Sequence, residues 1–191
     1  QVKIALAKGS SMVGTATNSG EGAFLPAERK AADKMIIQYV RGEWNKSDHL
    51  FRQADAVEIH LGQGAGGGTG SIVPSKELSW KVKRSMGVKW GEQALIHSTI
   101  PGMWHPNQLN RLVSLLKEVT GGVPVGVKMA ASKYIEKDLE IALSAGVDYI
   151  ALDGAQAGSK GTPPILQDDF GLPTLFALVR ASSYFEKHNL K

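Results

Sequence analysis

Glu21 stands in a segment where its carboxylate could do chemistry, because the stretch TNSGEGAF places it between Gly20 and Gly22. Glycines on both sides permit a tight turn or a close approach of the backbone to a ligand. The carboxylate is therefore placed either to accept hydrogen bonds from a substrate ammonium or imine, or to cap the turn that follows. Both interpretations fit the residues.

Lys128 is the second candidate, since it lies inside PVGVKMA, an apolar stretch typical of a central parallel strand. A charged side chain is almost never buried without a partner. A lysine near the end of such a strand would stabilise negative charge on a ligand, whereas a lysine on an edge strand would face water. The apolar neighbours favour the first interpretation.

Two glycine-rich segments follow other apolar stretches. GQGAGGGTG carries Gln63 and Gly64, and glycines let backbone N–H groups converge on an anion. This segment is consistent with a phosphate- or flavin-contacting loop, with a flexible lid or a linker as alternatives. LDGAQAGSKG carries Asp153, Gly154 and Gln156; it is a further candidate for the site, although Asp-Gly is also an ordinary turn pair.

The histidines do not predict a metal centre. The chain has 5 of them, and none is spaced with another histidine or an acid as zinc ligands on one helix face would be. His60 and His97 fall in predicted strands, where they line the site or belong to its wall. The motifs of serine hydrolases, dinucleotide-binding folds and P-loops are absent from the sequence.

The candidate residues other than Glu21 share a position at or near the carboxyl ends of predicted strands. Buried parallel strands are expected at 35–40, 56–61, 94–97, 123–129 and 148–152. Amphipathic helices are expected over 105–122, 135–146 and 172–191, and the chain begins in another helical pattern. Alternating strands and helices are typical of a parallel α/β fold. In a TIM-type (β/α) barrel, functional groups gather at the carboxyl ends of the strands, and this is the fold we expect.

The composition is that of an ordinary globular protein. The 191 residues carry a net charge of +4, with the basic residues scattered, so a nucleic-acid partner is not predicted. No apolar run reaches the ~18 residues of a membrane span, and the start of the chain does not resemble a signal peptide. The absence of cysteine excludes thiolate-bound metal in this chain and suits a cytoplasmic protein.

Five segments, taken in order, resemble the FMN-binding synthase domain of glutamate synthase. They are TNSGEGAF, VEIHLGQGAGGG, PVGVKMAA, DGAQAGSKGTPP and GLPTLFALVRA. Their order and spacing agree with that family over nearly the whole chain, from about Ala5 to Leu190. Each segment alone is a weak signal, and the five in register are a strong one.

The resemblance implies a barrel that holds FMN. In that family 2-oxoglutarate and ammonia, delivered from glutamine by a separate glutaminase part, form 2-iminoglutarate, which reduced FMN converts to L-glutamate. By similarity, Gln63 and Gly64 face the flavin, and Lys128 sits by its pyrimidine edge, where charge tunes the cofactor. We count Asp153 and Gly154 as further cofactor-binding residues. Lys128 and Glu21 are the predicted catalytic residues, with Glu21 on the substrate and ammonia side.

Residues 1–191 are expected to form one partial barrel domain with about five or six β/α units, because a complete barrel usually needs ~250 residues. The family's later loop for the FMN phosphate and its cluster-binding cysteines have no counterpart in this sequence. The resemblance also implies glutaminase and electron-donor subunits as partners. It does not identify the electron donor.

Departures from the family pattern keep other functions open. The family has a lysine where this chain has His60, and Lys160 stands in the segment AGSKG. A related synthase that makes N-methylglutamate from methylamine and another FMN barrel oxidoreductase are two alternatives. A non-catalytic half-barrel is the third.

Overall fold

The structure is a computed structural model that describes residues 1–156 and 162–190. Its strands are β1 (Thr17–Asn18), β2 (Met35–Tyr39), β3 (Ala56–His60), β4 (Ser71–Val73), β5 (Ala94–Ile96), β6 (Val125–Ala130) and β7 (Tyr149–Asp153). Its α-helices are α1 (Val2–Met12), α2 (Pro26–Ala31), α3 (Asp48–Phe51), α4 (Trp80–Met86), α5 (Asn107–Thr120), α6 (Ile135–Ser144), α7 (Pro164–Asp169) and α8 (Thr174–Lys187). The helices expected around 105–122, 135–146 and 172–191 are therefore confirmed as α5, α6 and α8.

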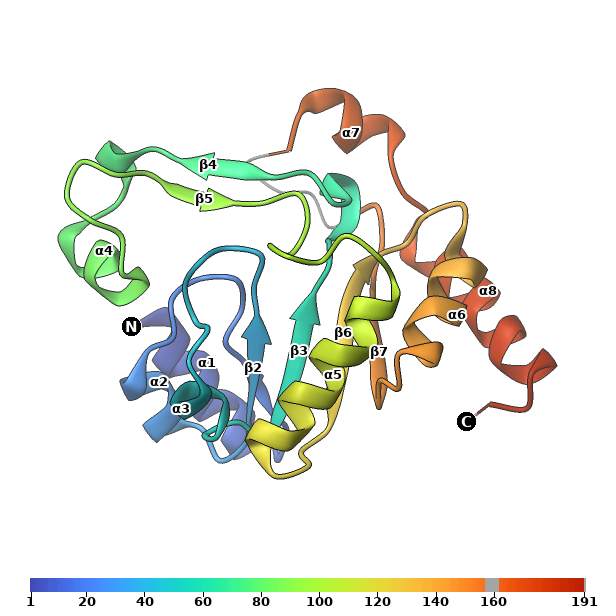
Figure 1. Cartoon of the computed structure of the whole chain (residues 1–191), viewed down its shortest axis with the longest axis horizontal. Coiled ribbons are helices and arrows are strands. Elements are labelled where there is room, and N and C mark those ends of the chain that lie inside the picture. The colour runs from blue at the N-terminus through green and yellow to red at the C-terminus, as the bar shows by residue number, and fades with distance from the viewer. Residues whose placement is uncertain (157–161, 191) are drawn as a thin grey trace.

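The main sheet has five parallel strands in the order β1-β2-β3-β6-β7 (Figure 1). Strands that follow one another in the chain are neighbours in this sheet, with helices in the connections. This is the arrangement of a (β/α) barrel seen in part, and it confirms the expected fold class.

The two faces of this sheet differ in polarity. Residues paired across parallel strands lie on the same face, and side chains alternate between faces along each strand. Gln38 pairs with Glu58, and His60 pairs with Lys128, which makes one face polar. The other face carries fully buried apolar side chains that pack into the main core with α5: Met35, Ile37, Val57, Ile59, Val125 and Val127.

The predicted parallel strand at 94–97 is wrong in its direction. β5 pairs antiparallel with β4, as Leu95 does with Ile72, in a separate two-stranded sheet. We call residues 71–96, which comprise β4, α4 and β5, the arm; it lies across the carboxyl ends of β2 and β3 (Figure 1). Three apolar residues in a row fit either direction of pairing, because periodicity does not fix a strand's partner.

The helices in the described part of the chain are too short or too polar to cross a membrane.

Candidate active site

The carboxyl ends of the main-sheet strands bring the predicted residues to one side of the molecule. Glu21 lies in the loop after β1, and Gln63 and Gly64 follow β3. Lys128 lies in β6, Asp153 is the last residue of β7, and Gly154 follows it. Lys128 is on a central strand between β3 and β7, not on an edge.

Glu21 faces two basic side chains rather than capping a turn. Its Oε1 lies 3.3 Å from His60 Nδ1 and 3.9 Å from the nearer Arg41 guanidinium nitrogen. His60 is 1% exposed, and the Glu21 side chain is 25% exposed. Gly20, at φ 66°, gives the backbone the left-handed turn that presents the carboxylate to these partners.

The electrostatics of this group keep Glu21 ionised. Burial acts to raise the pKa of its carboxyl, but the close imidazole of His60 and the charges of Arg41 and Lys128 outweigh burial, and the pKa is lowered. A carboxylate of this kind is suited to holding a positive group rather than to donating a proton.

Arg41 is a site residue that the sequence reasoning missed. It follows β2, is 3% exposed, and donates from Nη1 to the carbonyl oxygens of Gly68 (2.8 Å), Thr69 (3.3 Å) and Ser98 (3.3 Å). It therefore joins the Glu21 loop to the glycine-rich segment after β3. Its place at a strand end, directly before Gly42, was the signal that could have identified it.

Lys128 and Asp153 form the other half of the site. Lys128 Nζ lies 3.2 Å from Asp153 Oδ2, and the two side chains are 28% and 20% exposed. His60 and Lys128 are register partners on adjacent strands, so the Glu21 group and this ion pair share the polar face of the sheet.

A small polar cavity lies at Glu21. It has a volume of about 30 Å³ and is lined by Glu21, Arg41, Gln63, Gly66, Gly67, Thr69, Gly70, Ser71 and Thr162. One water molecule needs ~10–15 Å³ of such space. Two of the residues that line the cavity have a buried atom without a well-aligned hydrogen-bond partner in the described residues: Glu21 Oε1 and Arg41 Nε. The cavity thus suits small, polar, hydrogen-bonding molecules.

A comparison with known protein families identifies the family of this chain. The family described as a conserved region in glutamate synthase matches residues 1–191. The chain belongs to this family.

The similar proteins agree with that family. An archaeal-type glutamate synthase [NADPH] of Thermotoga sp. is 33% identical over 92% of this chain and 35% of its own length. An archaeal glutamate synthase [NADPH] of Archaeoglobus fulgidus is 31% identical over 91% of this chain and 34% of its own length. A glutamate synthase large subunit-like protein of Rhizobium meliloti is 29% identical over 91% of this chain and 39% of its own length. This glutamate synthase family member thus spans roughly a third of these relatives.

Similarity to a solved structure supports the fold. A protein described as a lactate oxidase of Pediococcus acidilactici has a TM-score of 0.56 at 14% identity, covering 97% of this chain and 49% of that one. At this identity the likeness concerns the fold alone.

Several glycines of the glutamate synthase segments are required by packing within the chain. A side chain on Gly62 would meet the Gly67 carbonyl oxygen at 2.4 Å, and one on Gly70 would meet the Ile96 carbonyl oxygen at 2.7 Å. Gly154 lies against the start of α8, where a Cβ would be 2.1 Å from Thr174 Oγ1. Gly64 is buried in a 3₁₀ turn, Gly64–Gly66. The flavin contact of Gly64 and Gly154 remains a prediction. Packing against Thr174 gives a separate, structural reason for a glycine at position 154.

Other sequence candidates fall outside the central group. His97 Nε2 lies 3.2 Å from Glu43 Oε1 on the arm side, and Gln156 Oε1 accepts from the Thr174 backbone N–H at 3.0 Å. Lys160 lies outside the described residues. The described residues contain no group of three or more histidine, aspartate or glutamate side chains arranged to hold a metal ion.

A polar cluster deeper on the same face was also missed. Glu58, 5% exposed, accepts from Asn18 Nδ2 at 3.0 Å and from Gln38 Nε2 at 2.6 Å. Burial, together with the charges of Glu58 and Asp148, raises the pKa of Tyr149 and keeps its hydroxyl protonated. Tyr149 donates this hydroxyl to the Val57 carbonyl. These bonds hold β1, β2, β3 and β7 in register below the site.

Proposed function

We propose that this chain forms part of an FMN-dependent glutamate synthase. In the proposed reaction 2-oxoglutarate and ammonia form 2-iminoglutarate, and reduction of the imine gives L-glutamate. FMN, when bound, supplies the hydride for this reduction. The rest of the assignment concerns what the residues of this chain do.

The observation that carries the proposal is the small cavity beside an ionised Glu21. Its volume of about 30 Å³ suits a molecule of the size of ammonia. The lowered pKa of Glu21 keeps a negative charge there, which would stabilise an ammonium or a protonated imine. Glu21 therefore has the chemistry expected on the ammonia side of the site.

The residues at the ends of β6 and β7 fit a flavin. Lys128 retains 28% exposure, so its ammonium group is accessible on the polar face although it pairs with Asp153. A fixed cation there would stabilise the negative charge of a reduced flavin ring. Gln63 lines the cavity at Glu21 and would lie between the two halves. Lys128, Gln63 and Asp153 are the residues we assign to the cofactor, with Gly64 and Gly154 beside them.

The cavity at Glu21 has room for ammonia or for methylamine, since its volume of about 30 Å³ exceeds the ~10–15 Å³ that one water molecule needs. The relatives that are named glutamate synthases favour ammonia. A synthase of N-methylglutamate type is the second candidate. The names of the Thermotoga and Archaeoglobus relatives include NADPH, and we propose NADPH as the source of electrons, with separate parts supplying the glutaminase and the electron transfer.

An absorbance spectrum tests the cofactor assignment. The purified 191-residue chain is mixed with FMN, desalted and scanned for the flavin band. We expect retained flavin, and we expect Lys128→Ala to weaken FMN binding about tenfold through loss of one charge interaction. The matched control is Lys117→Ala, which removes another partly exposed lysine paired with an aspartate, Asp148, away from the carboxyl ends of the strands.

The outcomes separate the alternatives. Retained flavin with equal losses in both lysine variants would remove Lys128 from the site. No flavin band in the wild-type chain would contradict FMN binding by these residues alone, since the family's FMN-phosphate loop has no counterpart in this sequence. With flavin bound, turnover of 2-oxoglutarate with ammonia, compared with methylamine and with other keto acids, identifies the acceptor and the amine.

A further inference from the structure

The backbone of the Glu21 loop is held by two residues of the loop after β2. Trp44 Nε1 donates to the Glu21 carbonyl oxygen at 2.8 Å. Asn45 Nδ2 donates to the Gly22 carbonyl oxygen at 2.8 Å, and Asn45 Oδ1 accepts from the Phe24 N–H at 3.0 Å. We call Trp44 and Asn45 the clasp, since they bind backbone groups of three residues of this loop.

Trp44 of the clasp packs against the arm. Trp44 is 5% exposed and forms a small core with Val40 and Ala94. The partly buried residues packed on this core come mainly from the arm and the turns within it: Val73, Leu78, Met86, Val88 and Ile96. Gly42 bridges to Ile96 of β5, and a Cβ at Gly42 would lie 2.4 Å from the Trp44 ring. The indole is thus fixed between the end of β2 and the arm.

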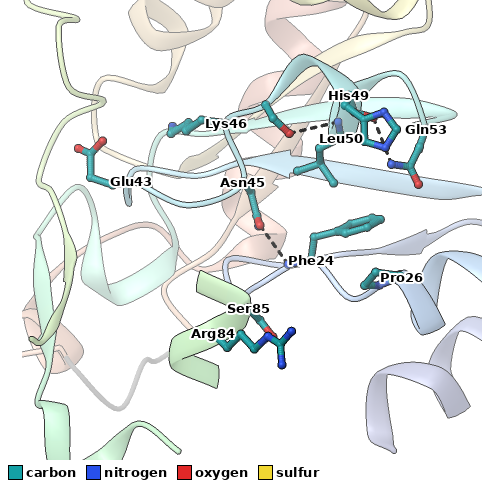
Figure 2. Close-up of a pocket in the computed structure, with 11 residues that line it drawn as sticks. Phe24, Pro26, Glu43, Asn45, Lys46, His49, Leu50, Gln53, Arg84 and Ser85 are labelled. Carbon is teal, nitrogen blue, oxygen red and sulfur yellow. Dashed lines mark hydrogen bonds between the residues drawn. The ribbon is translucent and has the colours of Figure 1, made fainter. Parts of the chain in front are cut away.

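Asn45 has a backbone suited to its role. Its φ of 57° is left-handed, a conformation that asparagine tolerates better than most residues. Figure 2 shows its side chain pointing toward Phe24, where the hydrogen bond is drawn. The asparagine thereby uses both ends of its amide on the Glu21 loop.

Helix α4 of the arm does not fill the space beside Phe24. A cavity of about 830 Å³ lies between the loop and α4, with Phe24, Pro26 and Asn45 on one side and Arg84 and Ser85 on the other (Figure 2). Open space separates Phe24 from α4, so α4 does not brace this part of the loop across the cavity, and Trp44 and Asn45 hold its backbone instead.

We propose that Trp44 and Asn45 are positioning residues that tie the Glu21 carboxylate to the arm, so that the position of the arm sets the distance of Glu21 from His60 and Arg41. A role of this link in catalysis rests on the proposed function, whereas the link between the arm and Glu21 does not. Any partner or ligand that displaces the arm would then act on Glu21 through the clasp.

The test measures the pKa of the Glu21 carboxyl in the full 191-residue chain by carbon-13 NMR. Trp44→Phe keeps an aromatic ring and removes the indole donor. We expect the pKa of Glu21 to rise, because the carboxylate moves away from His60, Arg41 and Lys128, which together lower it. Trp80→Phe is the matched control, since Trp80 is an exposed tryptophan of the same arm, and it should leave this pKa unchanged.

A second variant guards against an effect of misfolding. Asn45→Gly introduces glycine, which adopts a φ of 57° readily, and removes both hydrogen bonds of the Asn45 side-chain amide. Like Trp44→Phe, it should raise the pKa of Glu21, and its thermal unfolding should remain cooperative. An unchanged pKa of Glu21 in both folded variants would overturn the proposal. A shifted pKa in a chain that retains no FMN would support the clasp while contradicting the proposed function.

Discussion

Two regions at the carboxyl end of one sheet are built differently. Around Glu21 the partners are enclosed, with His60 and Arg41 at 1% and 3% exposure. Around β7 every strand residue is partly exposed. The helix beside it, α8, exposes large apolar side chains: Leu175, Phe176, Leu178 and Val179.

The difference shows which half of the site this chain organises by itself. The Glu21 half is held by hydrogen bonds and by the buried side chains of Arg41 and His60. The Lys128–Asp153 half lies beside β7, whose residues are partly exposed, and near the apolar face of α8. Exposed apolar surface of this kind marks an interaction site or a liability for aggregation. Changes at the two halves should therefore have different consequences for folding.

The largest expected effect is at Arg41. Arg41→Met removes three hydrogen bonds to carbonyls and leaves Glu21 without one of its cationic partners. Breaking one partner of a buried charge group costs about 3–5 kcal/mol. Urea denaturation followed by circular dichroism measures the loss of free energy of unfolding.

Arg180→Met provides the contrasting variant. Arg180 of α8 pairs with Glu136 of α6, and both side chains are more than a third exposed. An exposed ion pair contributes about 0–1 kcal/mol, so this loss should be small. Equal losses at Arg41 and Arg180 would contradict the idea that the Glu21 half is the more tightly braced one.

An intermediate effect is expected where α8 meets the sheet. Gly154→Ala forces a Cβ to within 2.1 Å of Thr174 Oγ1, and overpacking of this kind costs about 1–3 kcal/mol. Gly22→Ala is the control, because a Cβ there meets nothing within 4 Å, and its effect should stay below about 1 kcal/mol. Thermal unfolding of both variants decides whether Gly154 is needed for packing.

Much of the site followed from residue order alone. Gln63, Lys128 and Asp153 each lie at or near the end of an apolar stretch, and parallel strands bring such positions together. Glu21 was proposed from its flanking glycines and from the family resemblance, because no strand was predicted before it. The strands β2, β3, β6 and β7 were predictable as continuous apolar runs, and the helices over 107–120 and 135–144 because their apolar residues recur at the helical period.

The missed features depend on contacts between distant segments. Arg41 acts through carbonyls at positions 68, 69 and 98, and no local pattern announces those partners. Trp44 reads locally as an ordinary apolar residue, and its hydrogen bond to Glu21 exists only in the folded chain. The segment at 94–97 was predicted as a parallel strand, and its antiparallel pairing with β4 depends on the turns and the helix between the two strands. Tertiary contacts, rather than propensity, determined all three.

The smallest effect expected is in the acid dependence of stability. The pKa of Glu21 in the folded chain is lowered from 4.5, so its ionised form contributes stability above that pH, and this contribution is lost as pH falls through the lower folded value. Wild-type protein should therefore lose more free energy of unfolding between pH 7 and pH 3 than Glu21→Gln does. Urea titrations at the two pH values measure the difference.

Salt should distinguish the enclosed carboxylate of Glu21 from the exposed carboxylate of Glu136. The pKa of Glu136 is also lowered, by its hydrogen bonds with Arg180, but that pair is exposed. Exposed charges are screened at about 1 M salt, while enclosed ones are screened much less. The difference between wild type and Glu136→Gln should vanish in 1 M NaCl, and the difference for Glu21→Gln should persist. If salt abolishes both, Glu21 is in effect a surface carboxylate, and its enclosure with His60 and Arg41 does not hold in solution.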